Sequence, residues 1–180
     1  MLNEELENQI LESKLTYLNG YLDALAMICS YSVVGMRFKL FRYNFYGGNI
    51  ENAIQFNSFE LFGVHENDWK TEIKLIKNWE YRLKEEFYSN IIKRRIPIEY
   101  SRQEDNFDIR ENDLSTNLVQ SIKNAINYFI DILKKEFSNE TISVYELIVT
   151  NKRHYRIVGI DIIFEIDETK LILLQLLGSD

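Results

Sequence analysis

The sequence predicts an α+β fold in which an antiparallel sheet, closed by a carboxy-terminal three-strand meander, packs against two or three long amphipathic helices. Helical and strand-like segments occur in blocks and do not alternate strictly, which favours antiparallel pairing. Three strand-like runs with short polar connections close the chain, the pattern of a meander. No linker rich in proline, glycine or serine divides the 180 residues, so we expect one domain over residues 1–180.

The amino-terminal part predicts a helix followed by two strands. Residues 2–29 carry apolar residues every three to five positions, typical of an amphipathic helix, and Gly20 is a candidate break in it. Alternation in residues 36–46 predicts a half-buried strand. Gly47, Gly48 and Asn49 predict a turn, and residues 54–64 predict a second strand. The apolar stripe of the helix consists of Leu6, Ile10, Leu15, Leu18, Leu22, Leu25 and Cys29.

The middle of the chain predicts a helix, an edge strand and a polar loop. Helical spacing returns in residues 69–91, and Pro97 ends that helix. A short edge strand is expected at 96–100, because proline cannot donate to a central ladder. Residues 101–113 are the most polar stretch and predict a surface loop.

The carboxy-terminal part gives the clearest pattern, a helix over residues 114–137 followed by strands at 142–150, 155–166 and 170–177. The helix should bury one stripe against the carboxy-terminal sheet, because its apolar residues recur on a single helical face. That stripe comprises Leu118, Ile122, Ile126, Phe129, Ile130 and Leu133.

Composition and charge limit the classes of function. The net charge is −7, which disfavours a general nucleic-acid binder and favours a basic protein partner. The single cysteine, Cys29, lies among apolar residues and predicts a buried thiol in a reducing compartment. No secretory signal and no apolar run of membrane-spanning length is present, so we expect a cytoplasmic protein without membrane contact.

The chain has no recognisable catalytic or cofactor motif. Phosphate-binding glycine loops, a calcium loop and a nucleophile elbow are all absent from the sequence. His65 and His154 lack companions at metal-ligand spacing, so neither metal nor cofactor is expected. Asp161 and Glu165 would share one face of a strand. They are interpreted either as a catalytic carboxylate pair or, as is more common, as exposed residues on that face. Basic clusters at 93–95 and 152–156 are interpreted as a helix end and a hairpin tip.

An acidic loop is the feature most suggestive of binding. Five carboxylates crowd into one polar segment, where they are interpreted either as a solvated connection or as a surface that steers a basic partner. These residues are Glu104, Asp105, Asp108, Glu111 and Asp113.

The carboxyl end resembles the terminal hairpin of many bacterial toxin-immunity proteins. The residues that carry the resemblance are 160–166 (IDIIFEI) and 171–180 (LILLQLLGSD), a hydrophobic strand followed by glycine and an acidic residue. The pattern departs at Leu177, where an aromatic residue often precedes the glycine. The resemblance implies a small cytosolic protein that binds a toxin, and it assigns no functional residue.

Three hypotheses for function follow. The first is a non-catalytic protein-binding domain, of the bacterial immunity type, that neutralises a toxin by docking against it. The second is an enzyme or small-ligand binder whose site is assembled only in three dimensions, for instance around His65, Asp68 and tyrosines. The third is a structural or regulatory subunit that forms a homo-oligomer through its amino-terminal helix.

Overall fold

The structure is a computed structural model, and it describes eight parts of the chain. The described residues are 2–29, 35–43, 45, 49–56, 69–88, 113–151, 158–167 and 170–179.

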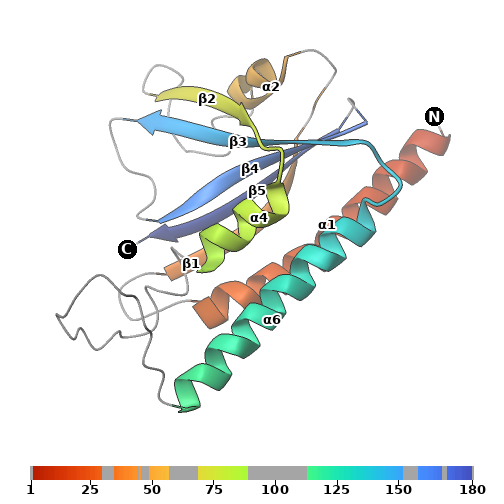
Figure 1. Cartoon of the computed structure of the whole chain (residues 1–180). Helices are drawn as coiled ribbons and strands as arrows, with labels where there is room; N and C mark the ends of the chain where they lie inside the picture. Colours follow the sequence, from red (N-terminus) through yellow and green to blue (C-terminus); the bar gives the residue numbers. More distant parts are fainter. Residues whose placement is uncertain are drawn as a thin grey trace.

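A five-stranded antiparallel sheet with helices on its faces makes up the described architecture, so the predicted α+β class is confirmed (Figure 1). The strands are β1 (Gly35–Tyr43), β2 (Trp69–Leu75), β3 (Ile142–Asn151), β4 (Val158–Ile166) and β5 (Lys170–Ser179). They are ordered β1-β5-β4-β3-β2, and β3, β4 and β5 form the predicted meander. The helices are α1 (Leu2–Cys29), α2 (Ile50–Phe56), α4 (Trp79–Glu85) and α6 (Asp113–Glu136).

Helices α1 and α6 lie side by side and run in opposite directions across one face of the sheet (Figure 1). Their buried side chains join those of α4 and of the facing strand residues in the larger of two hydrophobic cores. The stripe predicted for α6 is confirmed wherever its side chains are described, and only Leu118 lies outside them. The buried members are Ile122, Ile126, Phe129, Ile130 and Leu133.

The sheet has a second face with a smaller core of its own. Along β4, Ile160 and Ile162 point into the helical core, whereas Ile163 points to the opposite side, as strand alternation requires. On that opposite side Ile54 of α2 packs with Leu173 and its neighbours. The two faces are therefore covered by different elements.

The structure corrects two predictions in the amino-terminal half. Residues 69–75 form strand β2 and not the start of a helix, because Ile73 packs in the second core while Lys70, Glu72 and Lys74 alternate with the apolar positions. Residues 50–56 form helix α2, so the strand expected from residue 54 does not begin there.

Gly20 also fails to divide the first helix, since α1 runs without interruption from Leu2 to Cys29. Burial of Cys29 is confirmed. The edge strand expected at residues 96–100 lies outside the described residues.

Candidate functional site

Helix α1 carries a second apolar stripe, which we name the outer stripe and define as Leu6, Ile10, Tyr17 and Ile28. These positions are separated by four, seven and eleven residues, so they fall on one side of the helix. Between 37% and 56% of each residue is exposed, although the other side of the same helix is fully buried. The predicted single stripe of α1 was therefore wrong at Leu6 and Ile10, which face outward.

Tyr17 belongs to a group of aromatic side chains that spans the two helices, and we name Tyr17, Tyr21 and Tyr128 the tyrosine cluster. The ring centroids of Tyr21 and Tyr128 are 5.7 Å apart and their planes are inclined by 51°. Tyr21 is held in place, because its hydroxyl donates to the Ala125 carbonyl oxygen at 3.2 Å and its ring stacks on Phe129. Tyr17 and Tyr128 are each more than half exposed.

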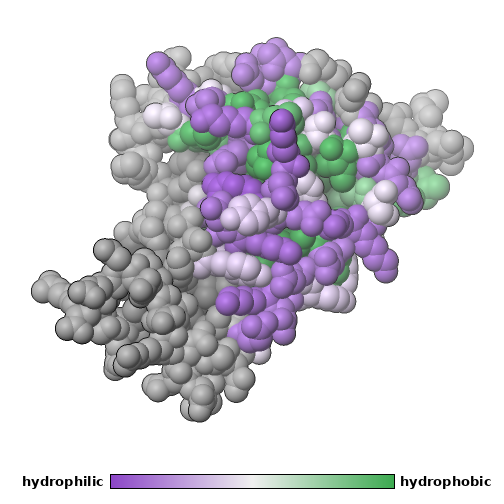
Figure 2. Space-filling model, viewed as in Figure 1, coloured by the Kyte–Doolittle hydropathy of each residue, from purple (hydrophilic) through white to green (hydrophobic). Residues whose placement is uncertain are grey.

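Burial and neighbouring hydroxyls both act on the central tyrosine. Burial raises the pKa of Tyr21 above its ordinary value, and the adjacent Tyr128 and Tyr17 raise it further, because a second phenolate there would be repelled. In Figure 2 hydrophobic atoms show between hydrophilic ones along the layer formed by α1 and α6.

Carboxylates dominate the exposed charges of α1. Glu5, Glu7, Glu12 and Asp23 are all exposed, and on α6 the exposed Asp131 lies one turn beyond Tyr128. By helical spacing Glu5, Glu12 and Asp23 project to a different side of α1 from the outer stripe. Glu7 lies 3.9 Å from Lys170 and Glu12 lies 3.5 Å from Arg42, so both are paired within the fold. Asp131 is the exposed carboxylate that neighbours the tyrosine cluster on the surface of α6.

The one lysine of α1 is engaged within the fold. Lys14 Nζ donates to the Glu136 carbonyl oxygen at the carboxyl end of α6, lies 3.5 Å from Glu140 Oε1 and sits over the Phe137 ring. A cation is favourable at a helix carboxyl end, so this contact joins α1 to α6. Lys14 is therefore turned toward the helix end and does not balance the exposed carboxylates.

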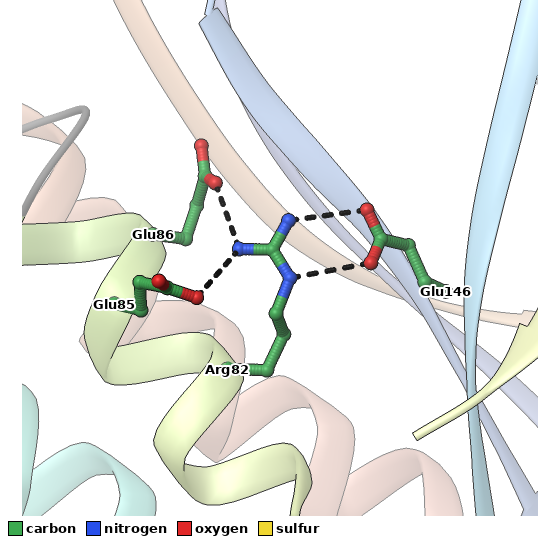
Figure 3. Close-up of polar contacts among 4 residues, drawn as sticks. All are labelled: Arg82, Glu85, Glu86 and Glu146. Atoms are coloured by element: carbon green, nitrogen blue, oxygen red, sulfur yellow. Dashed lines mark hydrogen bonds and ion pairs between the residues drawn. The ribbon is translucent and has the colours of Figure 1, made fainter.

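A second polar group joins α4 to the sheet (Figure 3). The guanidinium of Arg82 donates from Nε and Nη2 to the two carboxylate oxygens of Glu146 on β3, at 3.2 and 3.1 Å. Its Nη1 lies 3.4 Å from Glu86 and 3.6 Å from Glu85. The bond to Glu146 is the largest cause that raises the pKa of Arg82. Since every contact is internal, the group holds α4 against β3.

A third polar group lies on the face of the sheet opposite α1 and α6. Asp161 and Gln175 stand directly across from each other on β4 and β5, and Lys39 of β1 is the next residue in that row. Asp161 is fully buried and Gln175 is only 4% exposed, which corrects the expectation that Asp161 is exposed. Among the described residues, the Gln175 Nε2 has no hydrogen-bond partner.

Asp161 and Glu165 share one face, as predicted, but they do not form a carboxylate pair. The buried Ile163 stands between them, and four residues of strand correspond to roughly 13 Å. Glu165 instead accepts a hydrogen bond from the Tyr145 hydroxyl at 3.0 Å. General acid and base catalysis by these two carboxylates acting together is therefore not supported.

The residues predicted to bind a partner lie mostly outside the described part of the chain. This holds for Glu104, Asp105, Asp108 and Glu111, and Asp113 is the first residue of α6. His65, Asp68, His154 and the basic clusters at 93–95 and 152–156 also lie outside it.

The outer stripe was missed at the sequence level, although its signal is present. Leu6, Ile10 and Tyr17 recur at helical spacing, but on a different side of α1 from Leu15 and Leu18. A helix with two apolar sides must either be enclosed or have one side uncovered, and here one side is uncovered.

Comparisons with known proteins leave the site to be interpreted from its own geometry. Within the described ranges, no group of three or more histidine, cysteine or acidic side chains is arranged to hold a metal ion. Of the described helices, none is both long and apolar enough to cross a bilayer. No protein-family model, no curated protein and no solved structure matches the chain.

Proposed function

We propose that this chain is a non-catalytic protein-binding domain whose contact surface is the outer side of the α1 and α6 layer. The observation that carries the proposal is the outer stripe, in which large apolar side chains are exposed in line on a helix whose other side is fully buried. Single exposed apolar residues are ordinary, whereas an aligned set on a rigid element is typical of a protein interface. Exposed tyrosines are also enriched among the residues that dominate binding energy.

The more specific form of the proposal is an immunity protein that neutralises a bacterial toxin by direct binding. Two features support it: the terminal hairpin resembles that of immunity proteins, and the net charge of −7 complements a basic toxin domain. The cytoplasm is the expected site of such an interaction.

Affinity capture with matched variants tests the proposal. Three baits are used in lysate of the encoding organism. The first is the wild-type chain, the second is a triple variant with Leu6→Ser, Ile10→Ser and Tyr17→Ser, and the third is a double control with Leu75→Ser and Tyr81→Ser. Leu75 and Tyr81 are 61% and 63% exposed but lie away from the outer stripe, so the control matches the loss of exposed apolar surface.

A protein captured by the wild type and the control, and lost with the outer-stripe variant, is the expected result. Its reconstitution from purified components must reproduce the difference in affinity. Equal capture by all three baits, with melting curves showing that all are folded, would reject the outer stripe as the contact surface.

A small-ligand-binding protein is the second candidate, and the buried Asp161 and Gln175 on the other face of the sheet favour it. Polar side chains buried among apolar ones are a common feature of ligand sites. Native mass spectrometry of the chain purified from its own host checks this function. It requires a bound small molecule that Gln175→Leu abolishes, and a ligand-free wild type would contradict it.

A further inference from the structure

We propose that the tyrosine cluster binds an arginine side chain presented by an amphipathic helix of the partner. The inference rests on the proposed function and deepens it by naming the chemistry that the surface recognises. The cluster provides the aromatic contact, the outer stripe provides the apolar contact, and Asp131 beside Tyr128 provides the charge.

Geometry favours a planar cation at this position. Tyr21 is fixed by its bond to Ala125, and the ring of Tyr128 on α6 lies 5.7 Å from its ring. Tyr17 is four residues before Tyr21 on α1, so the two side chains are neighbours on the helix surface. A guanidinium binds by stacking on an aromatic face, and phenolic oxygens accept its N–H groups. A fixed ring with two exposed tyrosines as neighbours therefore offers an aromatic contact that needs little reordering on binding.

The local charge adds to the aromatic contact. Asp131 is three residues after Tyr128, so their side chains are neighbours on the surface of α6. Lys14 is three residues before Tyr17 but is engaged at the end of α6, and Lys135 lies a full turn beyond Asp131. An arginine at the cluster would therefore meet the carboxylate of Asp131 at close range.

The spacing of the surface favours a helix as the element that presents the arginine. Leu6, Ile10 and Tyr17 follow one line along α1, so apolar residues on one side of a partner helix can lie along them. Near the cluster, a side chain at Gly20 would meet no atom within 4 Å, so the surface is open there. A partner helix can therefore approach α1 closely beside Tyr17.

A second copy of the chain fits this surface less well than a basic partner. Neither the outer stripe nor the tyrosine cluster contains a cation that a second copy could place opposite Asp131. A carboxylate that faces no cation across an interface is unfavourable, whereas an arginine of a basic partner would neutralise Asp131.

The experiment uses designed peptides as probes against the full chain. One amphipathic helical peptide of about 15 residues carries leucines on one side with flanking arginines, and a second has every arginine replaced by the neutral isostere citrulline. Affinities are measured by isothermal titration calorimetry at two salt concentrations. The ratio of the two affinities isolates the guanidinium charge from apolar burial.

Three variants test whether the preference for arginine over citrulline depends on the tyrosine cluster. The first is a double variant, Tyr17→Leu with Tyr128→Leu, which removes the two exposed aromatic faces. The second, Tyr17→Phe with Tyr128→Phe, retains them. The third, Tyr81→Leu, is a control at an exposed tyrosine of α4. We expect the arginine peptide to bind the double leucine variant about tenfold more weakly than wild type. The phenylalanine variant and the control should retain most of the wild-type ratio.

The alternative outcomes are distinct. If the wild-type chain prefers arginine to citrulline but the leucine variant keeps that preference, the cluster is not the arginine site. Absence of any preference in the wild type also overturns the inference. A captured partner that is lost with the outer-stripe variant but binds Tyr128→Leu normally would preserve the proposed function and reject this inference alone.

Discussion

The side-chain amide of Asn19 pairs with both backbone groups of Leu40. Its Nδ2 donates to the Leu40 carbonyl oxygen at 2.9 Å, and the Leu40 N–H donates to its Oδ1 at 2.7 Å. Leu40 lies on β1, an edge strand of the sheet. The amide therefore replaces a neighbouring strand at this point, which ties α1 to the edge and blocks it against pairing with another chain.

Replacing Asn19 by leucine should destabilise the fold by about 1–3 kcal/mol, since a donor and an acceptor of β1 lose their partners. Urea denaturation measures the free energy of unfolding. Gln9→Leu, an exposed change on the same helix, serves as the control and should shift it by less than about 0.5 kcal/mol. Equal effects of the two changes would show that the pairing contributes no stability.

Gly159 should not tolerate a side chain. Its φ is 132°, and a Cβ there would lie 1.7 Å from the Leu176 carbonyl oxygen of the neighbouring strand. Gly159→Ala is expected to cost at least about 3 kcal/mol or to prevent folding, because both the backbone angle and the contact are unfavourable.

Gly20→Ala provides the matched control for that change. A Cβ at Gly20 meets nothing within 4 Å, and alanine is favoured over glycine inside a helix by about 1 kcal/mol. Thermal melting should therefore show opposite shifts for the two alanine variants. A stable Gly159→Ala protein would contradict the close approach of β4 and β5 at this position.

The bidentate contact between Arg82 and Glu146 should stabilise the fold in addition to the charge of the arginine. Arg82→Lys keeps the charge but cannot bind both oxygens of Glu146, whereas Arg82→Met also removes the cation beside the nearly buried Glu86. Because the arginine is 28% exposed, solvent screening limits the loss for methionine to about 1–3 kcal/mol. Lysine should fall between wild type and methionine in urea denaturation. No difference between lysine and arginine would contradict a role for the bidentate geometry.

Tyr145 should make the fold lose stability at alkaline pH. Burial raises its pKa above the ordinary value of 10.0, and the hydrogen bond to Glu165 raises it further. The unfolded chain therefore loses this proton first, so the stabilising contribution is complete below pH 10.0 and is lost as the pH rises through the folded-state pKa.

Urea denaturation between about pH 8 and pH 11 tests this sign. The free energy of unfolding should decline with pH in wild type and decline less steeply in Tyr145→Phe, which has no proton to lose. Identical slopes would show that Tyr145 does not contribute to the alkaline loss.

Much of the fold follows from local sequence patterns. The apolar residues of α6 repeat on one helical face over 24 residues, and only one side of such a helix can be buried. The meander of β3, β4 and β5 follows from strand-like runs joined by connections too short for a parallel crossover. In both cases the periodicity and the connection lengths permit a single solution.

The region from Trp69 to Leu75 shows where local pattern is ambiguous. Trp69, Ile73 and Ile76 fit helical spacing, but Thr71, Ile73 and Leu75 fit strand alternation equally well. Residues 69–75 form a strand because they pair with β3. Residues 145–151 of β3 provide the ladder of hydrogen bonds that an isolated segment cannot make. Such a partner is distant in sequence and leaves no local signal.

Tertiary packing alone determines which of these apolar and polar residues are exposed. The sequence determines that α1 has apolar residues at Leu6, Ile10 and Tyr17, but only the docking of α1 against α6 and β1 leaves that side uncovered. Likewise, alternation places Asp161 on a face of β4, but the second core decides that this face is buried. Periodicity shows which residues share a side of an element, whereas exposure depends on what packs against that side.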